Sequence, residues 1–295
     1  MVPRHGKKDR AHGKLLAASG QLRMSVSTRD QFLMGTYSLV SRSGLLQTAI
    51  GRELFRSAYF LYKRYIEDRL QGLLSSRPSL VRCGNVLDIG ANIGFTATVL
   101  ARAAEPGYRV YAFEPEPCNF GMLQETANRR ALKSKITALQ CAVGAEEGSV
   151  KLWQNLRHHG DHRVITDQFR SAMPDVSGIK VPIITIDQFL VRNPGPVSFV
   201  KIDVQGFELP VCQGMSRTIE MNRDLTIVLE YAPIALRNLG FDPSQLVGFL
   251  VSRGFQIYQV LPKGELSSGI PADLADTDYV DLLFSRRPLV CGKPE

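Results

Sequence analysis

The stretch NVLDIGANIGFT places Asp88, Gly90, Asn92 and Gly94 at every second position. The apolar residues before the acid predict a buried strand, and the residues after the last glycine predict the start of a helix. Free N–H groups at a helix start attract an anion, and glycine lets a ligand approach the backbone closely. The spacing therefore predicts a ligand-binding turn.

The acid narrows the choice of ligand. In the usual dinucleotide fingerprint no carboxylate occupies the place of Asp88, where it would repel a pyrophosphate lying along the turn. S-adenosylmethionine instead carries a sulfonium and an ammonium group, together with a carboxylate that suits the helix start. Asp88 therefore favours S-adenosylmethionine as the cofactor. Because asparagine adopts positive φ better than other non-glycine residues, we expect Asn92 to preserve the turn.

A second acid follows at a suitable distance. The segment YRVYAFEP predicts the next strand, and Glu114 ends it 26 positions after Asp88. A carboxylate at this strand end could accept both hydroxyl groups of a ribose. An acid at a strand end is also common on protein surfaces, but its spacing from Asp88 favours the cofactor interpretation.

These residues need a sheet that brings strand ends together. Strands and helices alternate along the chain, which predicts a doubly wound parallel sheet with helices on both faces. Two further strands, FQIYQVLP and YVDLLFSR, close the chain without a helix between them and must be antiparallel. We expect a mixed seven-stranded sheet whose strands are NVLDIG, YRVYAFEP, KITALQCAVG, VSFVKID, LTIVLEYA and this terminal pair.

The alternation is interrupted over residues 145–190. GSVKLWQN and GIKVPIIT predict a small antiparallel pair, which we interpret as an inserted hairpin on the acceptor side. Between them lie His158, His159 and His162. Histidine titrates near neutrality, so this loop could contribute a base, although a solvated polar loop explains the cluster at least equally well.

Charge divides the chain unevenly. Residues 1–80 hold 14 Lys and Arg against 5 Asp and Glu, whereas the rest holds 22 against 23. We expect a basic, mostly disordered leader over 1–45, a helical extension over 46–80 and a catalytic domain over 81–290. The extension predicts an amphipathic packing helix that could also cover the ligand. No apolar run predicts a membrane span or signal core, and five scattered cysteines suggest the cytoplasm.

The blocks VLDIGANIG, YAFEPEPCNF, CAVG, TIDQFL, VKIDVQGFE and IVLEYAP resemble the FkbM-type S-adenosylmethionine-dependent methyltransferases in order and spacing. The resemblance covers roughly residues 80–262. It implies a Rossmann-like class I methyltransferase fold and, usually, methylation of a hydroxyl on a sugar, polyketide or other small metabolite. One departure is Gln205, which stands where the family pattern K-I-D-V-E-G-x-E has its first glutamate.

The resemblance also implies roles for individual residues. Asp88, Gly90, Asn92 and Gly94 match the cofactor loop, and Glu114 matches the acid for the ribose. The adenine end of the cofactor would lie near Asn119, Ala142 and Val143.

Asp203 matches the end of the fourth strand, facing the methyl donor, and is the first candidate for a base or for a group that orients the acceptor hydroxyl. His158 and His159 come second. Glu208 opens a helix, where a charge that favours the helix dipole is the simpler interpretation. Glu230 ends the neighbouring strand and could line the acceptor site. Magnesium between Asp203 and Glu230 is conceivable, but no third ligand is evident, so we expect no metal.

Three alternatives remain open. A nicotinamide oxidoreductase is disfavoured by Asp88 and by the lack of G-x-G-x-x-G. A non-catalytic protein with a degenerate methyltransferase fold would account for Gln205, but the intact loop opposes it. An RNA methyltransferase could use the basic leader, yet the chain has no Pro-Pro pair after the fourth strand and few aromatic residues in the leader, which makes nucleic acid a poor partner. The oligomeric state is not encoded in any motif.

Overall fold

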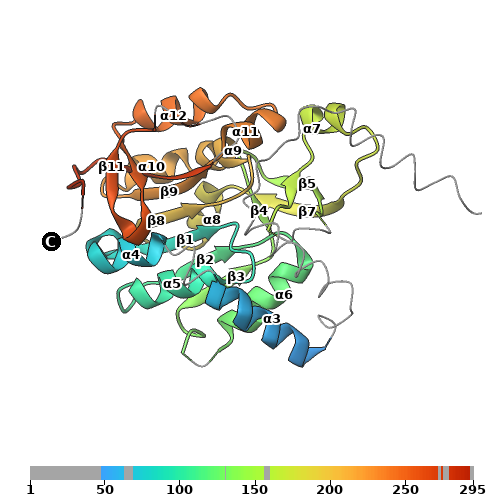
Figure 1. Ribbon diagram of the computed structural model, residues 1–295, viewed down its shortest axis with the longest axis horizontal. Helices are drawn as coiled ribbons and strands as arrows, with labels where there is room; N and C mark the ends of the chain where they lie inside the picture. Colours follow the sequence, from blue (N-terminus) through green and yellow to red (C-terminus); the bar gives the residue numbers. More distant parts are fainter. Residues whose placement is uncertain are drawn as a thin grey trace, which may run out of the picture.

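The computed structural model describes residues 48–62, 69–129, 131–155, 160–271, 274 and 279–292. Figure 1 shows a central sheet with helices above and below it and a smaller sheet beside it. This is the Rossmann-like α/β fold that the alternation of strands and helices predicts. The leader over 1–45, and with it the interpretation of disorder, lies outside the described residues.

The main sheet has the strand order β11-β10-β12-β9-β8-β1-β2-β3. Neighbours from β9 to β3 run parallel, and β12 pairs antiparallel with both β9 and β10, as the missing crossover helix predicts. The strands are β1 (Asn85–Ile89), β2 (Val110–Phe113), β3 (Ile136–Leu139), β8 (Val197–Ile202), β9 (Thr226–Tyr231), β10 (Gln256–Val260), β11 (Leu266–Ser268) and β12 (Val280–Ser285).

Within the described part of the chain, the sheet therefore has eight strands and not the predicted seven. The additional strand, β11, lies in the segment that was predicted to be a connection. Its three residues are too few to show an alternating pattern, so only the pairing with β10 defines it. Gly264, with φ of 77°, lies in the turn between the two strands. A second correction concerns KITALQCAVG, which forms two strands because the chain leaves the main sheet after Leu139.

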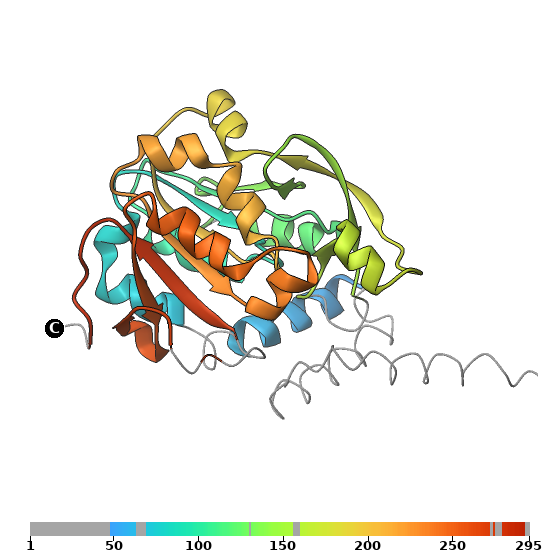
Figure 2. The same ribbon diagram turned by 90° about the horizontal axis from the view of Figure 1, so that it is seen from above.

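Helices cover both faces of the main sheet. The described helices are α3 (Ala49–Tyr62), α4 (Arg69–Ser76), α5 (Phe95–Ala103), α6 (Pro117–Ala127), α7 (Asp167–Ala172), α8 (Ile186–Arg192), α9 (Glu208–Gln213), α10 (Ser216–Met221), α11 (Pro233–Asn238) and α12 (Pro243–Val251), with short 3₁₀ turns at η3 (Pro78–Val81) and η4 (Pro262–Gly264). Of these, α7 packs against the smaller sheet. Figure 2, seen from above, shows the helices drawn in orange lying across one face.

Two apolar cores result from the alternation of side chains along each strand. Val86 packs with α4, α5 and α6 on one face, whereas Leu87 packs with α8 to α12 on the other. Both side chains are fully buried, as expected for the central strand of a parallel sheet.

The second sheet has the order β4-β7-β5-β6 and lies beside the main sheet at the carboxyl end of β3 (Figure 1). Its strands are β4 (Ala142–Val143), β5 (Gly148–Trp153), β6 (Arg163–Val164) and β7 (Ile179–Ile184). β5 and β7, the two alternating segments of the interruption, pair antiparallel, and β4 joins β7 in parallel. A small core around Leu152, Phe169 and Phe207 connects this sheet to the rest.

The N-terminal extension contains two helices, and residues 63–68 between them lie outside the described part. α3 packs against α5 and α6 through an edge-to-face contact of Phe60 with Phe95 and a hydrogen bond from Arg56 to Glu125. Packing, the simpler of the two predicted roles, is thus what the described contacts show. The boundaries at 46–80 and 81–290 stay predictions. Within the described residues, no helix is long and apolar enough to cross a membrane.

Candidate active site

The glycine turn follows β1 directly and is held in a left-handed conformation. Gly90, Asn92 and Gly94 have φ values of 82°, 50° and 90°. A side chain at Gly90 would overlap the backbone carbonyl of Asp203, because the turn packs tightly against the end of β8. The N–H of Asp203 completes this junction with a bond of 2.9 Å to the carbonyl of Ile89. Asn92 adopts the positive φ expected of it.

Asp88 lies inside β1 and is 1% exposed. Burial raises the pKa of its carboxyl from 3.8 to about 7, although the Lys201 ammonium lowers it and Asp203 raises it further. Its Oδ2 atom is buried and has no hydrogen-bond partner among the described residues. A buried acceptor left unpaired in this way is unfavourable, so the position suits a ligand that brings a donor or a positive charge.

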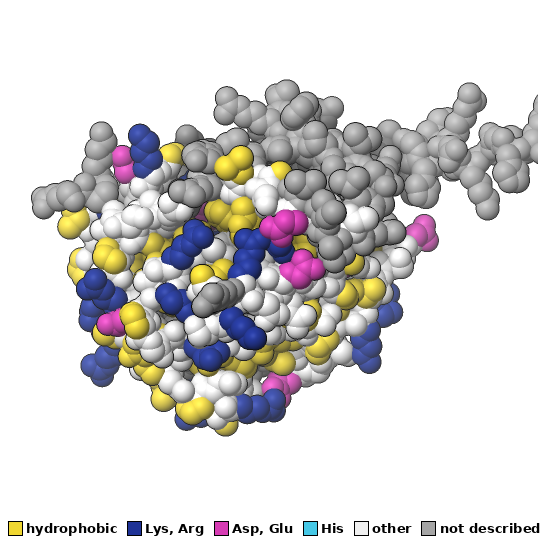
Figure 3. Space-filling model, turned by 90° about the horizontal axis from the view of Figure 1, so that it is seen from below, with side chains coloured by type: hydrophobic (Ala, Val, Ile, Leu, Met, Phe, Trp, Pro, Cys, Tyr) yellow, Lys and Arg dark blue, Asp and Glu magenta, His cyan; other side chains and the backbone are white. Residues whose placement is uncertain are grey.

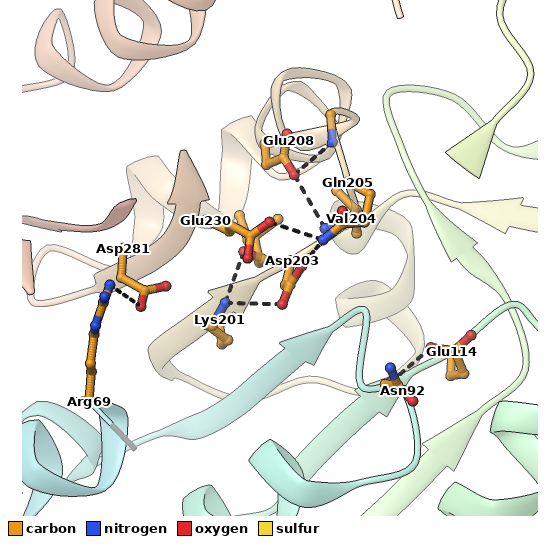
Figure 4. A network of polar contacts seen from close by, with 12 residues as sticks. Arg69, Asn92, Glu114, Lys201, Asp203, Val204, Gln205, Glu208, Glu230 and Asp281 are labelled. Atoms are coloured by element: carbon orange, nitrogen blue, oxygen red, sulfur yellow. Dashed lines mark hydrogen bonds and ion pairs between the residues drawn. The ribbon is translucent and has the colours of Figure 1, made fainter. Parts of the chain in front are cut away.

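Glu114 follows β2 and connects it to the glycine turn. Its Oε2 accepts the N–H of Asn92 at 2.8 Å, and its Oε1 accepts the N–H of Glu116 at 2.9 Å. Figure 4 shows the first of these bonds. Burial raises the pKa of Glu114 from 4.5 to about 8, against the effect of both N–H groups. Each carboxylate oxygen retains a lone pair that could accept a ribose hydroxyl.

Glu116 is a site residue that the sequence reasoning missed. It caps the start of α6, where its Oε2 accepts the N–H of Asn119 at 2.7 Å. Its Oε1 accepts Nε2 of Gln154 at 2.8 Å, which links the residue after β5 to the start of α6. An acid followed by proline just before a helix is the signal that could have identified this cap.

The residues proposed for the adenine end come from α6 and β4, and Asn119 is linked to Glu114 through the hydrogen bonds of Glu116. Asn119 is buried in the first turn of α6, and Ala142 and Val143 form β4 with side chains buried. The N–H of Gly144 bonds to Ile184 at 3.0 Å, so β4 is fixed to the second sheet. The structure brings these residues to the side of β2 and β3, and their adenine contact stays a prediction.

Carboxylates from neighbouring strands meet at the carboxyl edge of the sheet (Figure 4). Asp203 follows β8, and Glu230 lies in the adjacent strand β9. Gln205 bridges them, since its Nε2 donates to Asp203 at 2.9 Å and to Glu230 at 3.0 Å. Gln205 itself has φ of 54°, which turns its amide back toward the sheet. Gln205, the residue that departs from the family pattern, thus joins the two acids through its side-chain amide.

The charge of this acidic edge is balanced from below by Lys201. Its Nζ lies 3.8 Å from Oδ2 of Asp203, whose side chain is 38% exposed. Burial alone would lower the pKa of Lys201, but the surrounding carboxylates raise it overall. Glu230 has its pKa raised well above the ordinary value, first by burial and then by the charge of Asp203. The half-buried carboxylate of Asp203 is thus held by an amide and an ammonium group.

Glu208 opens α9 and supports the loop that carries Gln205. Its Oε1 accepts the N–H groups of Val204 at 3.3 Å and Gly206 at 3.1 Å. Burial raises the pKa of Glu208 to about 7. This is a more specific structural role than the helix-dipole charge predicted for it. Farther along the edge, Asp281 of β12 is held by Arg69 of α4 at 3.5 Å.

His158 and His159 lie outside the described residues, so their catalytic role stays a prediction. His162 is described, and its Nδ1 accepts the N–H of Asn155 at 3.1 Å within the same loop. Among the described residues, no three or more of His, Cys, Asp and Glu are placed to hold a metal ion.

Comparison with known proteins assigns the chain to a protein family. A family model described as methyltransferase FkbM domain matches residues 88–257, more than half of the chain. The hexuronic acid methyltransferase AglP of Haloferax volcanii is 27% identical over 195 residues, covering 65% of this chain and 67% of that protein. Methyltransferase sdnD of Sordaria araneosa is 25% identical over 232 residues, covering 68% of this chain and 83% of that protein.

Among solved structures, methyltransferase FkbM from Methylobacillus flagellatus KT matches with a TM-score of 0.43 and 20% identity, covering 69% of this chain. The chain spans only 43% of that protein. The sequence match carries the assignment: it begins at Asp88 and runs through the glycine turn, Glu114, Asp203 and Glu230. With these acids brought together on one sheet, the chain is a methyltransferase that belongs to the FkbM domain family.

Proposed function

We propose that this methyltransferase uses S-adenosylmethionine to methylate a hydroxyl oxygen of a sugar, glycan, polyketide or other small metabolite. The buried carboxylate of Asp88 carries the proposal, because its Oδ2 lacks a partner beside a turn with three positive φ angles. A cationic ligand at this place would supply the missing partner and stabilise the ionised carboxylate.

The chain's residues would divide the binding of this cofactor. S-adenosylmethionine would supply an activated methyl group on its sulfonium. Asp88 would attract the positive charge, and the N–H groups at the start of α5 would receive the ligand's carboxylate. Glu114 would accept the ribose hydroxyls while it holds the glycine turn through Asn92. Asn119, Ala142 and Val143 remain the proposed surroundings of the adenine.

Asp203 is the proposed group that orients the acceptor hydroxyl and takes its proton. It combines a fixed position with partial exposure, since Gln205 and Lys201 hold it while its side chain stays 38% exposed. A positioned base contributes roughly 10²–10⁴-fold to such a reaction, and orientation of the acceptor contributes further. Gln205 and Lys201 are positioning residues in this proposal.

A sugar hydroxyl is the acceptor that we favour. The relative AglP is named a hexuronic acid methyltransferase, which supports a sugar ring. The edge where the acceptor would bind is acidic, however, with Asp203 and Glu230 adjacent and Asp281 on the next strand. Like charges in a site are strongly unfavourable, so we propose a neutral ring in preference to an anionic one.

The cofactor proposal is tested by calorimetric titration of the protein with S-adenosylhomocysteine and S-adenosylmethionine. Asp88→Asn and Glu114→Gln should weaken binding at least about tenfold, equivalent to about 1.4 kcal/mol each. Glu146→Gln removes an exposed acid from the turn before β5 and should bind like the parent protein. Normal affinity in both site variants would contradict the assigned site.

The acceptor proposal needs a separate measurement. Methyl transfer should be followed by mass spectrometry with a neutral hexoside and its matching hexuronide. The neutral ring should be methylated faster, and Glu230→Gln should reduce the difference. A preference for the hexuronide in the parent protein would refute the electrostatic argument without affecting the cofactor assignment.

A further inference from the structure

A cavity of about 490 Å³ lies on the outer side of α5, bordered by α3, by α4 and by the segment that leads into β3. None of the carboxylates of the candidate active site lines it. Its size lies within the range of roughly 300–1,000 Å³ typical of ligand pockets. Figure 3 shows the face seen from below, where Lys and Arg side chains gather around hydrophobic ones. The cavity lining thus combines apolar side chains with Arg and Lys side chains.

One end of the cavity is apolar and aromatic. Phe60 of α3 and Phe95 at the start of α5 meet edge to face, with ring centroids 5.4 Å apart. Val99, one turn farther along α5, and Leu132 continue the apolar lining. Leu61, which also lines the cavity, is 59% exposed.

The other end is cationic. Arg102 lies at the last turn of α5, and Lys135 directs its ammonium to the carbonyl of Ala101 at 3.0 Å. Among the described residues, neither Arg102 nor Lys135 forms an ion pair. The distance along α5 from Phe95 to Arg102 is seven residues, or about 10 Å at 1.5 Å per residue. The apolar and cationic ends are therefore separated by the length of a medium alkyl chain.

The positive charges of the two other basic residues in the lining are already balanced by ion pairs with acids. Arg56 pairs with Glu53 and with Glu125, the latter at 3.0 Å. Arg129 pairs with Glu53 at 2.8 Å. The four basic side chains outnumber these two acids, and the excess positive charge belongs to the end formed by Arg102 and Lys135. Charge complementarity therefore calls for an anion at that end.

We propose that this cavity binds a single-chain amphiphilic anion. Its apolar chain would lie along α5 toward Phe60 and Phe95, and its phosphate or carboxylate head would lie at Arg102 and Lys135. Burial of the chain supplies the main driving force, and two cations fix the direction of the ligand. The site differs from the methyl-transfer site in place and in chemistry, so it stands independently of the proposed acceptor.

The experiment uses the full chain and decyl phosphate at concentrations where it is monomeric. Calorimetric titration should show saturable one-to-one binding. Decyl maltoside, with an uncharged head, and inorganic phosphate, without a chain, should each bind at least about tenfold more weakly. Equal binding of inorganic phosphate would overturn the proposal in favour of a simple anion site, and equal binding of the maltoside would remove the role of the cations.

Two kinds of variant locate the ligand. Arg102→Glu combined with Lys135→Glu should weaken decyl phosphate at least about tenfold, whereas Lys180→Glu combined with Arg223→Glu reverses two exposed cations elsewhere and should leave it unchanged. Val99→Phe should fill the cavity and weaken binding, with Val251→Phe on the exposed face of α12 as its control. Circular dichroism confirms that each variant is folded.

Unchanged affinity in the charge-reversed protein would overturn the proposal, as would a failure of decyl phosphate to bind. Vesicles of phosphatidylcholine with and without phosphatidylglycerol provide a further arm. Attachment to the anionic vesicles without binding of the monomeric ligand would assign the basic residues to a flat membrane-facing surface in place of a cavity.

Discussion

The buried carboxyl of Asp88 makes the stability of the ligand-free protein depend on pH in an unusual direction. Burial raises its pKa from 3.8 to about 7, so the folded protein holds a proton that the unfolded chain has already released near neutrality. Stability rises with pH only where the unfolded state binds more protons. Here the folded state binds more, so this group makes the free energy of unfolding fall as pH increases from about 4 to above 7.

The magnitude follows from the two pKa values. Between pH 6 and pH 8 the unfolded carboxyl is ionised throughout, while the folded one with its pKa of about 7 loses its proton. Averaged over these two pH units, the folded carboxyl binds about half a proton more than the unfolded one. This difference lowers the free energy of unfolding by about 1.4 kcal/mol between pH 6 and pH 8. Asp88→Asn removes this contribution, so the variant should lose about 1.4 kcal/mol less than the parent protein over the same interval.

Urea denaturation at pH 6, 7 and 8, followed by circular dichroism without cofactor, measures the difference. Glu114 and Glu208 also have raised pKa values and act in the same direction, so only the comparison with Asp88→Asn isolates the one group. The control variant Glu146→Gln should show the same dependence of unfolding free energy on pH as the parent protein. Parallel pH dependences of the parent protein and Asp88→Asn would show that Asp88 is ionised throughout, and the account of its burial would then be wrong.

Three further predictions concern the same edge of the sheet. Affinity for S-adenosylmethionine should increase up to roughly tenfold from pH 6 to pH 8, because the ligand favours the ionised Asp88, and titration calorimetry on Asp88→Asn should show this dependence flattened. Gln205→Glu should destabilise the protein by about 1–3 kcal/mol at pH 8, because it replaces an amide donor by a third carboxylate, whereas Gln213→Glu on an exposed helix end should change urea stability little. Gly90→Ala should destabilise more than Gly107→Ala, since both have positive φ but only the first would strike backbone atoms, and thermal denaturation should show the larger loss for Gly90→Ala.

The sequence predicted the parts of this fold in which one residue or one period determines the structure. The loop from Asp88 to Gly94 was predictable because glycine and asparagine at fixed spacing encode positive φ, and all three residues adopt it. The parallel order of the central strands followed from the helices between them, and the antiparallel terminal pair followed from the lack of one.

The missed features depend on partners far along the chain. β11 is a strand only because β10 lies beside it, and β4 leaves the main sheet only because β7 offers another edge. Neither partner can be read from the short segment itself. Likewise Glu116 looks like one of several acids around a proline until the structure shows that it joins α6 to Gln154, just after β5.

The structure gives Gln205 a role that the sequence difference alone did not indicate. As a sequence difference it suggested a lost charge beside the reaction centre and a degenerate site. In the fold its amide donates to both Asp203 and Glu230, two carboxylates that would otherwise repel each other, with Lys201 of β8 as a nearby balancing charge. A glutamate without a proton offers no donor at this position and would add a third negative charge. The glutamine therefore preserves a defined arrangement of the two acids, and the departure from the family pattern gives no reason to consider the site inactive.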